Sequence, residues 1–553
     1  MGVVIFWAVF LALLIFALVI NVRNDRLKKQ ERKAFLLSRF GDFDKASQET
    51  IDYTKSEGLY NYLTEKDKNN LQLDEITYFD LSLDQLINGL NQTVSSPGED
   101  YLVYKFKTLN QDCSVSRKEW ELIEYYRNNK EIRNETLLCL DELPKYKKFD
   151  SFKVIFDLKN KKSDSNIIHY ILDILLVLSF ALIFIFPGPG FTMLFIMMGV
   201  NAATYFSGKR KMEEGLYGFA YSNLVINCAR KLSLIDEKNQ FDEYKDLFGL
   251  TKGRFLISFK KGTTSNPFSI LADYLKLFLH FDLIYYNSKL KKISEKSEEI
   301  IGLYILLGRI DCLISIASFV ESQKIFCNFQ ECDFGEGFEI KGMIHPLNTE
   351  PVPNDFENKR GIILTGSNAS GKSTFLKACG INVILAQNFG FALAKEYKGP
   401  YVRLYSSMSI SDNISKRDSF FVSEAKSLKR MCDATCEYSN VFCLIDEVFK
   451  GTNTLERISC ATSLLKYLAK DSCICFAATH DAELCLLLKD SYSPYYFTEE
   501  IVNEVMTFPY KIGKGVAGEG NAVRLLELLS YDKGITEDAR NLCEFYKNKG
   551  RWE

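Results

Sequence analysis

The twenty residues GIILTGSNASGKSTFLKACG, at positions 361–380, constrain the fold of this chain more than any other stretch. A short apolar run ends in glycine, a loop of small residues follows, and Lys-Ser-Thr opens a helix-like stretch. The loop fits G-x-x-x-x-G-K-[ST], a pattern in which backbone N–H groups and a helix N-terminus close around phosphate oxygens. We expect this loop to bind ATP through Gly366, Ser367, Asn368, Ala369, Ser370, Gly371, Lys372, Ser373 and Thr374. Lys372 should reach the β- and γ-phosphates, and Ser373 should bind Mg²⁺.

A second motif, VFCLIDEVFKGTNT at 441–454, places two carboxylates after a buried strand. Ligand sites of parallel sheets lie at the carboxyl ends of the strands. Asp446 can hold Mg²⁺ through water or through Ser373, and Glu447 is placed to orient or deprotonate an attacking water. The alternative is a pair of solvated carboxylates, which the loop about 75 residues upstream makes less favourable.

The third motif, CICFAATHDAEL at 473–484, is a strand that ends in Thr479 and His480. A histidine at the tip of a strand beside the phosphate loop can sense the γ-phosphate, although a lone histidine is more often structural. Strand patterns at 361–365, 441–445 and 473–478 alternate with helix patterns at 372–390 and 454–470. This alternation predicts an α/β domain with a parallel sheet. Apolar residues often three or four apart predict that most of 34–165 and 212–325 is helical. The expected fold is therefore an α/β domain preceded by a mainly α-helical domain and, from the apolar runs described next, membrane-spanning helices.

Residues 3–20 form an uncharged apolar run, just long enough to cross a bilayer. Six basic residues follow it between positions 23 and 33, whereas a signal peptide carries its basic residues before the apolar run. We therefore predict an uncleaved anchor whose C-terminal flank is cytoplasmic.

A second apolar block, from about 167 to 206, is interrupted by PGPG at 187–190. The two Pro-Gly pairs predict a turn with a helix on either side. Lysine and arginine residues flank both ends of the block, so both ends should be cytoplasmic. The favoured interpretation is a two-helix membrane hairpin; a shallower re-entrant loop and a buried soluble hairpin are the alternatives. Asp173 is interpreted as an interfacial residue, with a functional intramembrane carboxylate as the alternative.

The composition bears on two further questions, the binding partner and the redox state of the cysteines. The net charge of −2 gives no sign of a nucleic-acid partner, although a local basic patch is compatible with it. Fifteen cysteines are scattered without the doubled CxxC spacing of a zinc site, which indicates reduced cysteines in a cytosolic setting.

The predicted order of domains follows from these segments. It is a transmembrane anchor (1–22), a cytoplasmic helical linker (23–74), a helical core in two parts (75–166 and 208–335) separated by the membrane hairpin (167–207), an ATPase domain (336–530) and a helical tail (531–553). Within the core, Ser95-Ser96-Pro97-Gly98 predicts a turn, and 303–322 predicts a buried apolar helix.

The wording and spacing of the three motifs resemble the MutS family of DNA mismatch-repair ATPases. The family's T-G-P-N-M-x-G-K-S-T is similar to residues 365–374, its D-E-x-x-x-G-T-x-T to 446–454, and its A-T-H-x-x-E-L to 478–484. Weaker similarities lie at 91–106, 308–317, 344–346, 352–355 and 515–529. The resemblance is specific over 336–530 and weaker over about 75–335.

The resemblance implies that two ATPase domains dimerise and that each completes the other's site. A serine-bearing segment crosses to the partner's γ-phosphate in this family, and SKRDSFFVSEAKSL at 415–428 matches it, with Ser419 in that role. Phe420 stands where the family often has threonine. The family's N-terminal mismatch-reading domain has no counterpart here, and the membrane hairpin occupies the place of its DNA clamp.

The resemblance therefore implies a membrane-anchored homodimeric ATPase with ATP and Mg²⁺ as cofactors, catalytic Glu447 and His480, and DNA repair as the expected class. A membrane-tethered ATP switch that acts on a protein or on the bilayer, without DNA, is the main alternative. A transporter subunit of the ABC type would need an L-S-G-G-Q-like signature and a larger membrane domain, and the sequence has neither.

Overall fold

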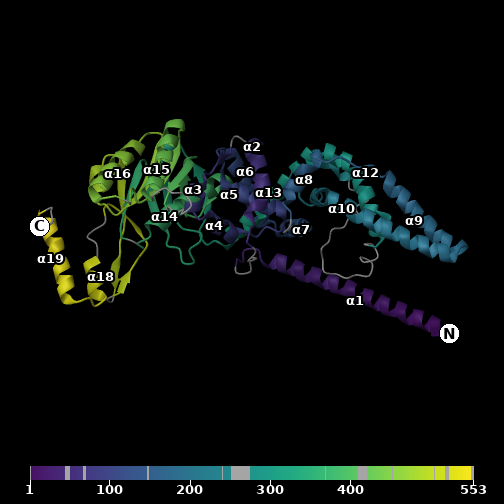
Figure 1. Cartoon of the computed structure of the whole chain (residues 1–553). Helices are drawn as coiled ribbons and strands as arrows, with labels where there is room; N and C mark the ends of the chain where they lie inside the picture. Colours follow the sequence, from purple (N-terminus) through teal and green to yellow (C-terminus); the bar gives the residue numbers. More distant parts are fainter. Residues whose placement is uncertain are drawn as a thin grey trace. The chain divides into compact units, whose positions relative to one another are not determined.

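The computed structural model describes residues 2–43, 50–66, 70–145, 149–239, 241–250, 274–367, 369–408, 420–450, 452–502, 505–516 and 522–549 (Figure 1). The chain folds into two compact units that interleave along the sequence. The first unit comprises residues 1–66, 90–104 and 123–322, and the second comprises 67–89, 105–122 and 323–553.

A six-stranded sheet forms the centre of the second unit. Its order is β15-β12-β6-β11-β10-β9, with β6 Gly361–Thr365, β9 Arg403–Ser407, β10 Val441–Asp446, β11 Cys473–Thr479, β12 Tyr492–Phe497 and β15 Ile512–Lys514. Five strands run parallel, and only β15 pairs antiparallel, with β12. The predicted parallel sheet of an α/β domain is thereby confirmed. Every residue of β6, β10 and β11 is buried, as expected for strands covered on both faces.

Helices follow the strands in the predicted alternation. They are α14 (Lys372–Phe389), α15 (Phe420–Glu437), α16 (Thr454–Leu468) and α17 (Glu483–Leu487). The motif at 361–380 thus folds as β6, a loop and α14, and the carboxyl ends of β6, β10 and β11 meet at one edge, because Asp446 pairs with Ala478 and Thr479 pairs with Thr365.

A five-stranded sheet with parallel and antiparallel pairs completes most of the second unit. Its order is β5-β4-β8-β3-β7, with β3 Cys327–Glu331, β4 Phe338–Met343, β5 Asn354–Asn358, β7 Phe391–Ala392 and β8 Glu396–Gly399. The pair β13 (Glu500–Val502) and β14 (Val505–Thr507) and the helices α18 (Ala522–Leu528) and α19 (Lys533–Lys549) follow near the C-terminus.

Segments from the N-terminal half also belong to the second unit. Residues 75–89 and 105–122, which we expected in the helical core, lie there. Strand β1 (Leu71–Gln72) pairs with β2 (Thr108–Leu109). The buried Asn388 amide on α14 donates to the carbonyl of Thr108 at 2.7 Å, and its oxygen accepts from the N–H of Asn110 at 2.8 Å. These contacts join distant sequence, which local patterns cannot reveal.

The first unit is helical, as predicted for most of 34–165 and 212–325. Its helices are α1 (Gly2–Ser38), α2 (Tyr53–Lys66), α5 (Ser96–Lys107), α7 (Lys130–Leu140), α8 (Ser151–Phe156), α9 (Ile167–Ile185), α10 (Pro187–Leu232), α12 (Phe281–Glu295) and α13 (Ser297–Ser322). The expected apolar core helix at 303–322 is the buried part of α13. Its Asp311 carboxylate accepts from the N–H groups of Val94 and Ser95 at 3.1 and 2.9 Å, next to the start of α5.

Both predicted Pro-Gly turns proved wrong in the same way. The chain reverses at Phe186 alone, and PGPG forms the first turn of α10. Likewise, α5 begins at Ser96, so Pro97 and Gly98 are helical. Proline is accepted in a first helical turn because the N–H it lacks would have no partner there.

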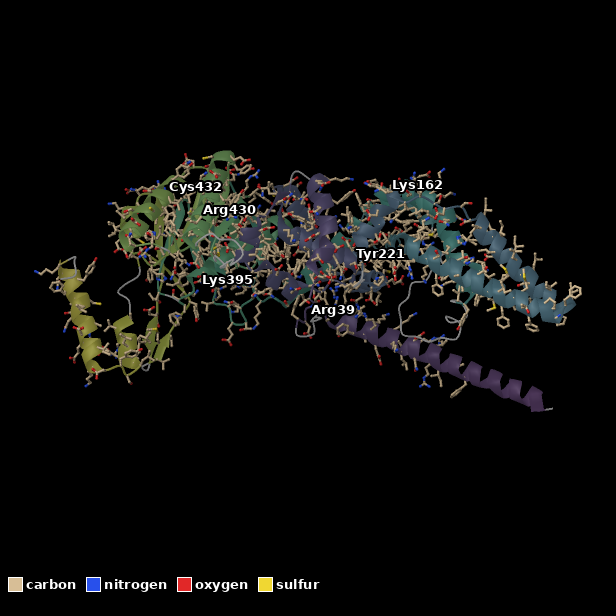
Figure 2. All side chains as sticks on the ribbon, in the orientation of Figure 1. Arg39, Lys162, Tyr221, Lys395, Arg430 and Cys432 are labelled. Carbon is tan, nitrogen blue, oxygen red and sulfur yellow. The ribbon has the colours of Figure 1, made fainter. Side chains whose placement is uncertain are left out.

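The two arms α9 and α10 lie side by side and expose apolar side chains (Figures 1 and 2). Among the described residues, α9, α10 and α13 are long and apolar enough to cross a membrane by length and composition. Burial separates them: the apolar window of α13 is 78% buried, against 17% and 22% for α9 and α10. Helix α10 also runs without a break through the expected domain boundary at 207/208 into the helical unit.

Helix α1 passes the expected anchor boundary at residue 22, and the side chains of residues 2–15 lie outside the described set. None of the fifteen cysteines, all of which lie in the described residues, forms a disulfide. No group of three or more His, Cys, Asp or Glu side chains that could hold a metal occurs in the described part of the chain.

Candidate nucleotide-binding site

The phosphate-loop motif forms a cradle whose backbone requires small residues. Gly366 and Gly371 have φ values of 147° and 113°, and Ala369 has a φ of 64°. A Cβ at Gly366 would lie 2.7 Å from the carbonyl oxygen of Phe497. Side chains at these glycines would therefore strain the loop and crowd the space that its N–H groups surround.

Lys372, the first residue of α14, points back into this loop. Its ammonium donates to the carbonyl oxygens of Gly366 and Ser367 at 2.7 and 2.9 Å. Burial lowers the pKa of this ammonium below its ordinary value, while nearby Asp446 and Glu447 act in the opposite direction. A buried cation beside a glycine-rich loop, at the first residue of a helix, fits a polyphosphate.

The side chains of Ser373, on α14, and Asp446, at the end of β10, contact each other. The Ser373 hydroxyl donates to the Asp446 carboxylate at 2.5 Å. Asp446 ends the buried strand β10 and is 9% exposed, and Ser373 is the second residue of α14, beside the loop. Two hard oxygen atoms at this separation fit Mg²⁺, which takes one or two protein oxygens and completes its shell with phosphate and water.

Glu447 and His480 form the second pair at this edge. His480 Nε2 lies 2.8 Å from Glu447 Oε1, and Lys450 Nζ lies 3.4 Å from Glu447 Oε2. The backbone of Glu447 is left-handed, with a φ of 62°, and its N–H donates to the carbonyl of Ala478 at 2.9 Å. This arrangement turns the carboxylate out of the strand direction and toward the histidine, where it can accept a proton.

The sequence reasoning missed a residue that supports this turn. Glu424 on α15 is 3% exposed, and its Oε1 accepts from the N–H groups of Phe449 and Lys450 at 2.6 and 3.3 Å. Phe449 also has a left-handed φ, of 59°. Burial raises the pKa of the Glu424 carboxyl above its ordinary value. In the sequence, Glu424 appears as a glutamate within an amphipathic helix pattern. The sequence alone cannot distinguish such a glutamate from a surface carboxylate.

Two more side-chain contacts lie at this edge of the sheet. Ser367 donates a hydrogen bond to Glu499, a residue that no motif marked. Arg457 makes two hydrogen bonds to Asp481, at 2.9 and 2.7 Å, beside His480. A planar arginine–carboxylate pair fixes the loop after β11 more firmly than a single contact would.

The structure thus brings the predicted residues of the loop, the acidic pair and the histidine to one edge of the parallel sheet. Thr374 follows Ser373 on α14 and is exposed, and Ser370 donates to the carbonyl of Ser367 at 2.8 Å. Asn368 and Ser419 lie outside the described residues, so their predicted roles stay predictions.

A family model and several known proteins are similar to this chain. The family model of MutS domain V matches residues 362–546. The DNA mismatch repair protein MutS of Pseudothermotoga lettingae is 29% identical over 314 residues, which are 53% of this chain and 38% of the relative. MutS of Thermus thermophilus is 31% identical over 214 residues, 38% of this chain and 26% of the relative. The human MutS protein homolog 4 is 28% identical over 271 residues, 46% and 28% of the two chains.

The matched part of the chain spans between a quarter and two fifths of the length of these relatives. The domain match begins inside β6, just before the phosphate loop, and continues past the histidine at the end of β11. The motif resemblance, the parallel sheet and these matches lead to one conclusion: residues 362–546 form a domain of the MutS domain V family.

Proposed function

We propose that this protein is a Mg²⁺-dependent ATPase of the MutS family that uses ATP as a dimer to drive a conformational switch. The observation that carries the proposal is the convergence of Lys372, the Ser373–Asp446 pair and the Glu447–His480 pair at one sheet edge. Each group matches one requirement of phosphoryl transfer to water: phosphate binding, metal binding and orientation of the attacking water.

In this proposal, the loop N–H groups and Lys372 bind the β- and γ-phosphates. Ser373 and Asp446 would hold Mg²⁺, which when bound neutralises charge on the phosphate oxygens. Glu447 orients the water and accepts its proton, and His480 holds the Glu447 carboxylate in place. Ser419 would contact the γ-phosphate of the partner subunit in a closed homodimer, as the family resemblance implies.

DNA binding is proposed from the family. Relatives named as DNA mismatch repair proteins support mismatched or branched DNA as the expected ligand. The steady-state ATPase rate of the detergent-solubilised full-length protein would test this, with matched duplex, mismatched duplex and a four-way junction at low and moderate salt. Glu447→Gln is the blank, and stimulation by one DNA form above the others supports a DNA-processing role.

A membrane-tethered switch without DNA is the second candidate, and the uninterrupted helix α10 favours it. This helix runs from the hairpin tip at Pro187 to Leu232 within the helical unit, so a movement of its C-terminal part would reach the hairpin directly. In either case we place the protein in the membrane as a multi-pass protein, with the ATPase domain and the helical core in the cytoplasm. Turnover that no DNA form changes would favour this second candidate.

A further inference from the structure

From residue 274 onward, the chain contacts the hairpin part of the way along its arms rather than at its base. Residues 274–279 form a short helical stretch, His280 adopts a left-handed backbone with a φ of 45°, and α12 then begins at Phe281. The buried Asn201 amide on α10 donates to the carbonyl of Phe278 at 2.7 Å. This segment is therefore attached to the second arm of the hairpin at Asn201.

The His280 side chain joins the segment to both arms. It has no exposed surface, and its Nδ1 lies 2.9 Å from the Asp173 carboxylate of α9. Its Nε2 lies 3.0 Å from the carbonyl oxygen of Asn201 on α10. Asp173, interpreted from sequence as an interfacial residue, thus has a partner that is 107 residues away in the chain.

A second buried hydrogen bond also joins the segment to α10. Tyr205 on α10 donates to the Asp282 carboxylate at 2.9 Å, and both side chains are buried. The ring of His169 on α9 also lies 4.9 Å from that of His280. Polar groups inside an apolar hairpin are costly without partners, and these contacts supply partners to both sides.

The level of this attachment follows from helix geometry. Asp173 is six residues into α9, which at 1.5 Å per residue is about 9 Å beyond its first residue. Asn201 is five residues before Phe206, or about 8 Å from that end of the apolar block. Residues 278–282 are therefore held between the base of the apolar arms and the hairpin tip, about 8 to 9 Å from the base.

The outer side of the segment is apolar. Tyr274 is 54% exposed, Leu275 44% and Phe281 41%, although their neighbours attach to the hairpin. The segment that carries these side chains contacts α9 and α10. Both arms also expose apolar side chains, which the hairpin proposal assigns to lipid. Two lysines farther along α12, Lys291 and Lys292, are exposed and suit the phosphate level of a bilayer.

We propose that residues 274–282 are a third membrane-contacting element, which lies in the headgroup layer beside the hairpin and contacts phospholipid through Tyr274, Leu275 and Phe281. The proposal rests on insertion of the hairpin, which is part of the proposed function. It adds a lipid-binding surface that the hydropathy of the sequence did not mark, because Asp282 and His280 break the apolar pattern.

Photo-crosslinking of the full-length protein tests this element. p-Benzoylphenylalanine replaces Leu275 or Phe281 in protein reconstituted into phosphatidylcholine–phosphatidylglycerol vesicles, and mass spectrometry counts lipid adducts after irradiation. Phe184, near the hairpin tip and 79% exposed, is the positive control for insertion. Leu234, just after α10 and 85% exposed, is the matched negative control.

The proposal expects lipid adducts at positions 275, 281 and 184 and none at 234. Adducts at 184 without adducts at 275 and 281 would overturn the third element and leave the hairpin intact. A lack of adducts at all four positions would refute hairpin insertion and the third element together. Crosslinks from 275 and 281 to a protein in place of lipid would identify a protein-binding surface and also overturn the proposal.

A variant of the attachment point provides a second readout. His280→Ala removes the bond to Asp173 on α9 and one bond to Asn201, and it leaves the Asn201–Phe278 and Tyr205–Asp282 bonds to α10. Because the segment loses its bond to α9, adducts at 275 and 281 should fall several-fold while those at 184 stay unchanged. Equal adduct yields at 275 and 281 with and without His280 would show that the histidine does not position the segment, and would count against the attachment on which the proposal depends.

Discussion

His480 Nε2 and Glu447 Oε1 lie 2.8 Å apart, although the two residues follow different strands of the sheet. The contact couples the residue proposed to accept a proton to the residue proposed to hold it. Only the parallel pairing of β10 with β11, with Asp446 opposite Ala478, brings them to the same level.

Glu447→Gln should keep ATP binding and lose turnover, because glutamine fills the same space but cannot accept a proton. A general base contributes about 10²- to 10⁴-fold to a rate, so we expect kcat to fall by at least about 10²-fold. Steady-state turnover and equilibrium binding of labelled ATP measure the two effects. The variant should also accumulate the ATP-bound dimer, and turnover at the wild-type rate would refute the assignment.

His480→Gln should have a smaller effect than loss of the carboxylate. Glutamine can still donate one hydrogen bond to Glu447, so we expect a loss of about tenfold or less in kcat, the equivalent of roughly one hydrogen bond. The comparison requires both variants in the same assay. A loss as large as that of Glu447→Gln would mean that His480 itself takes part in the chemistry.

Lys372→Ala should abolish nucleotide binding, since it removes the buried cation beside the loop. Lys395→Ala is the matched control, because Lys395 is an exposed lysine of the same unit that lies outside the loop (Figure 2). Binding of a fluorescent ATP analogue distinguishes them. Equal affinity of the two variants would contradict the phosphate role of Lys372.

Glu424→Ala should loosen the turn that carries Glu447. The N–H groups of Phe449 and Lys450 would lose their acceptor, and a buried donor without a partner costs about 1–3 kcal/mol. We expect a lower kcat with little change in KM, and Glu424→Gln should restore most of the rate because its amide oxygen can accept the same bonds. Equal losses for both variants would argue that the charge of Glu424 matters rather than its position.

Asp311 should make the helical unit less stable as the pH rises. Burial raises the pKa of its carboxyl to about 6, above the value of about 3.9 in an unfolded chain. The native state thus binds the extra proton, so this stabilisation is complete below about pH 4 and is lost as the pH rises through 6. The difference of two units corresponds to about 3 kcal/mol.

Urea unfolding midpoints of the wild type and Asp311→Asn, measured between pH 4 and 7, check this prediction. The variant carries no ionisable group at that position, so its midpoint should fall less across this range than that of the wild type. Parallel curves for the two proteins would show that the Asp311 carboxyl does not titrate in this interval.

The strand–loop–helix unit and the parallel sheet could be predicted because their signals are local. Apolar runs, glycines at positions of positive φ and carboxylates after a strand are all visible in a few residues, as at Gly371 and Asp446. The turns predicted at the Pro-Gly segments were wrong because the same residues suit a turn and a first helical turn equally well.

Contacts between distant segments could not be predicted. Nothing in the sequence around Glu424 says that its carboxylate accepts from the backbone near residue 449, and nothing around Asp173 points to His280. Likewise, Asn388 connects α14 to backbone about 280 residues earlier, so the second unit includes pieces of the predicted helical core. These pairings depend on tertiary structure, which a single sequence without homologues does not reveal.

Helix α10 couples any movement of the hairpin to the rest of the helical unit. An α-helix is stiff along its axis and holds its residues in a fixed angular relation, so a tilt or rotation at Tyr221 within the helical unit is also a tilt or rotation at Asn201 (Figure 2). His280 fastens both arms to the start of α12 at that level. The hairpin and the segment 278–282 should therefore move together as one rigid body.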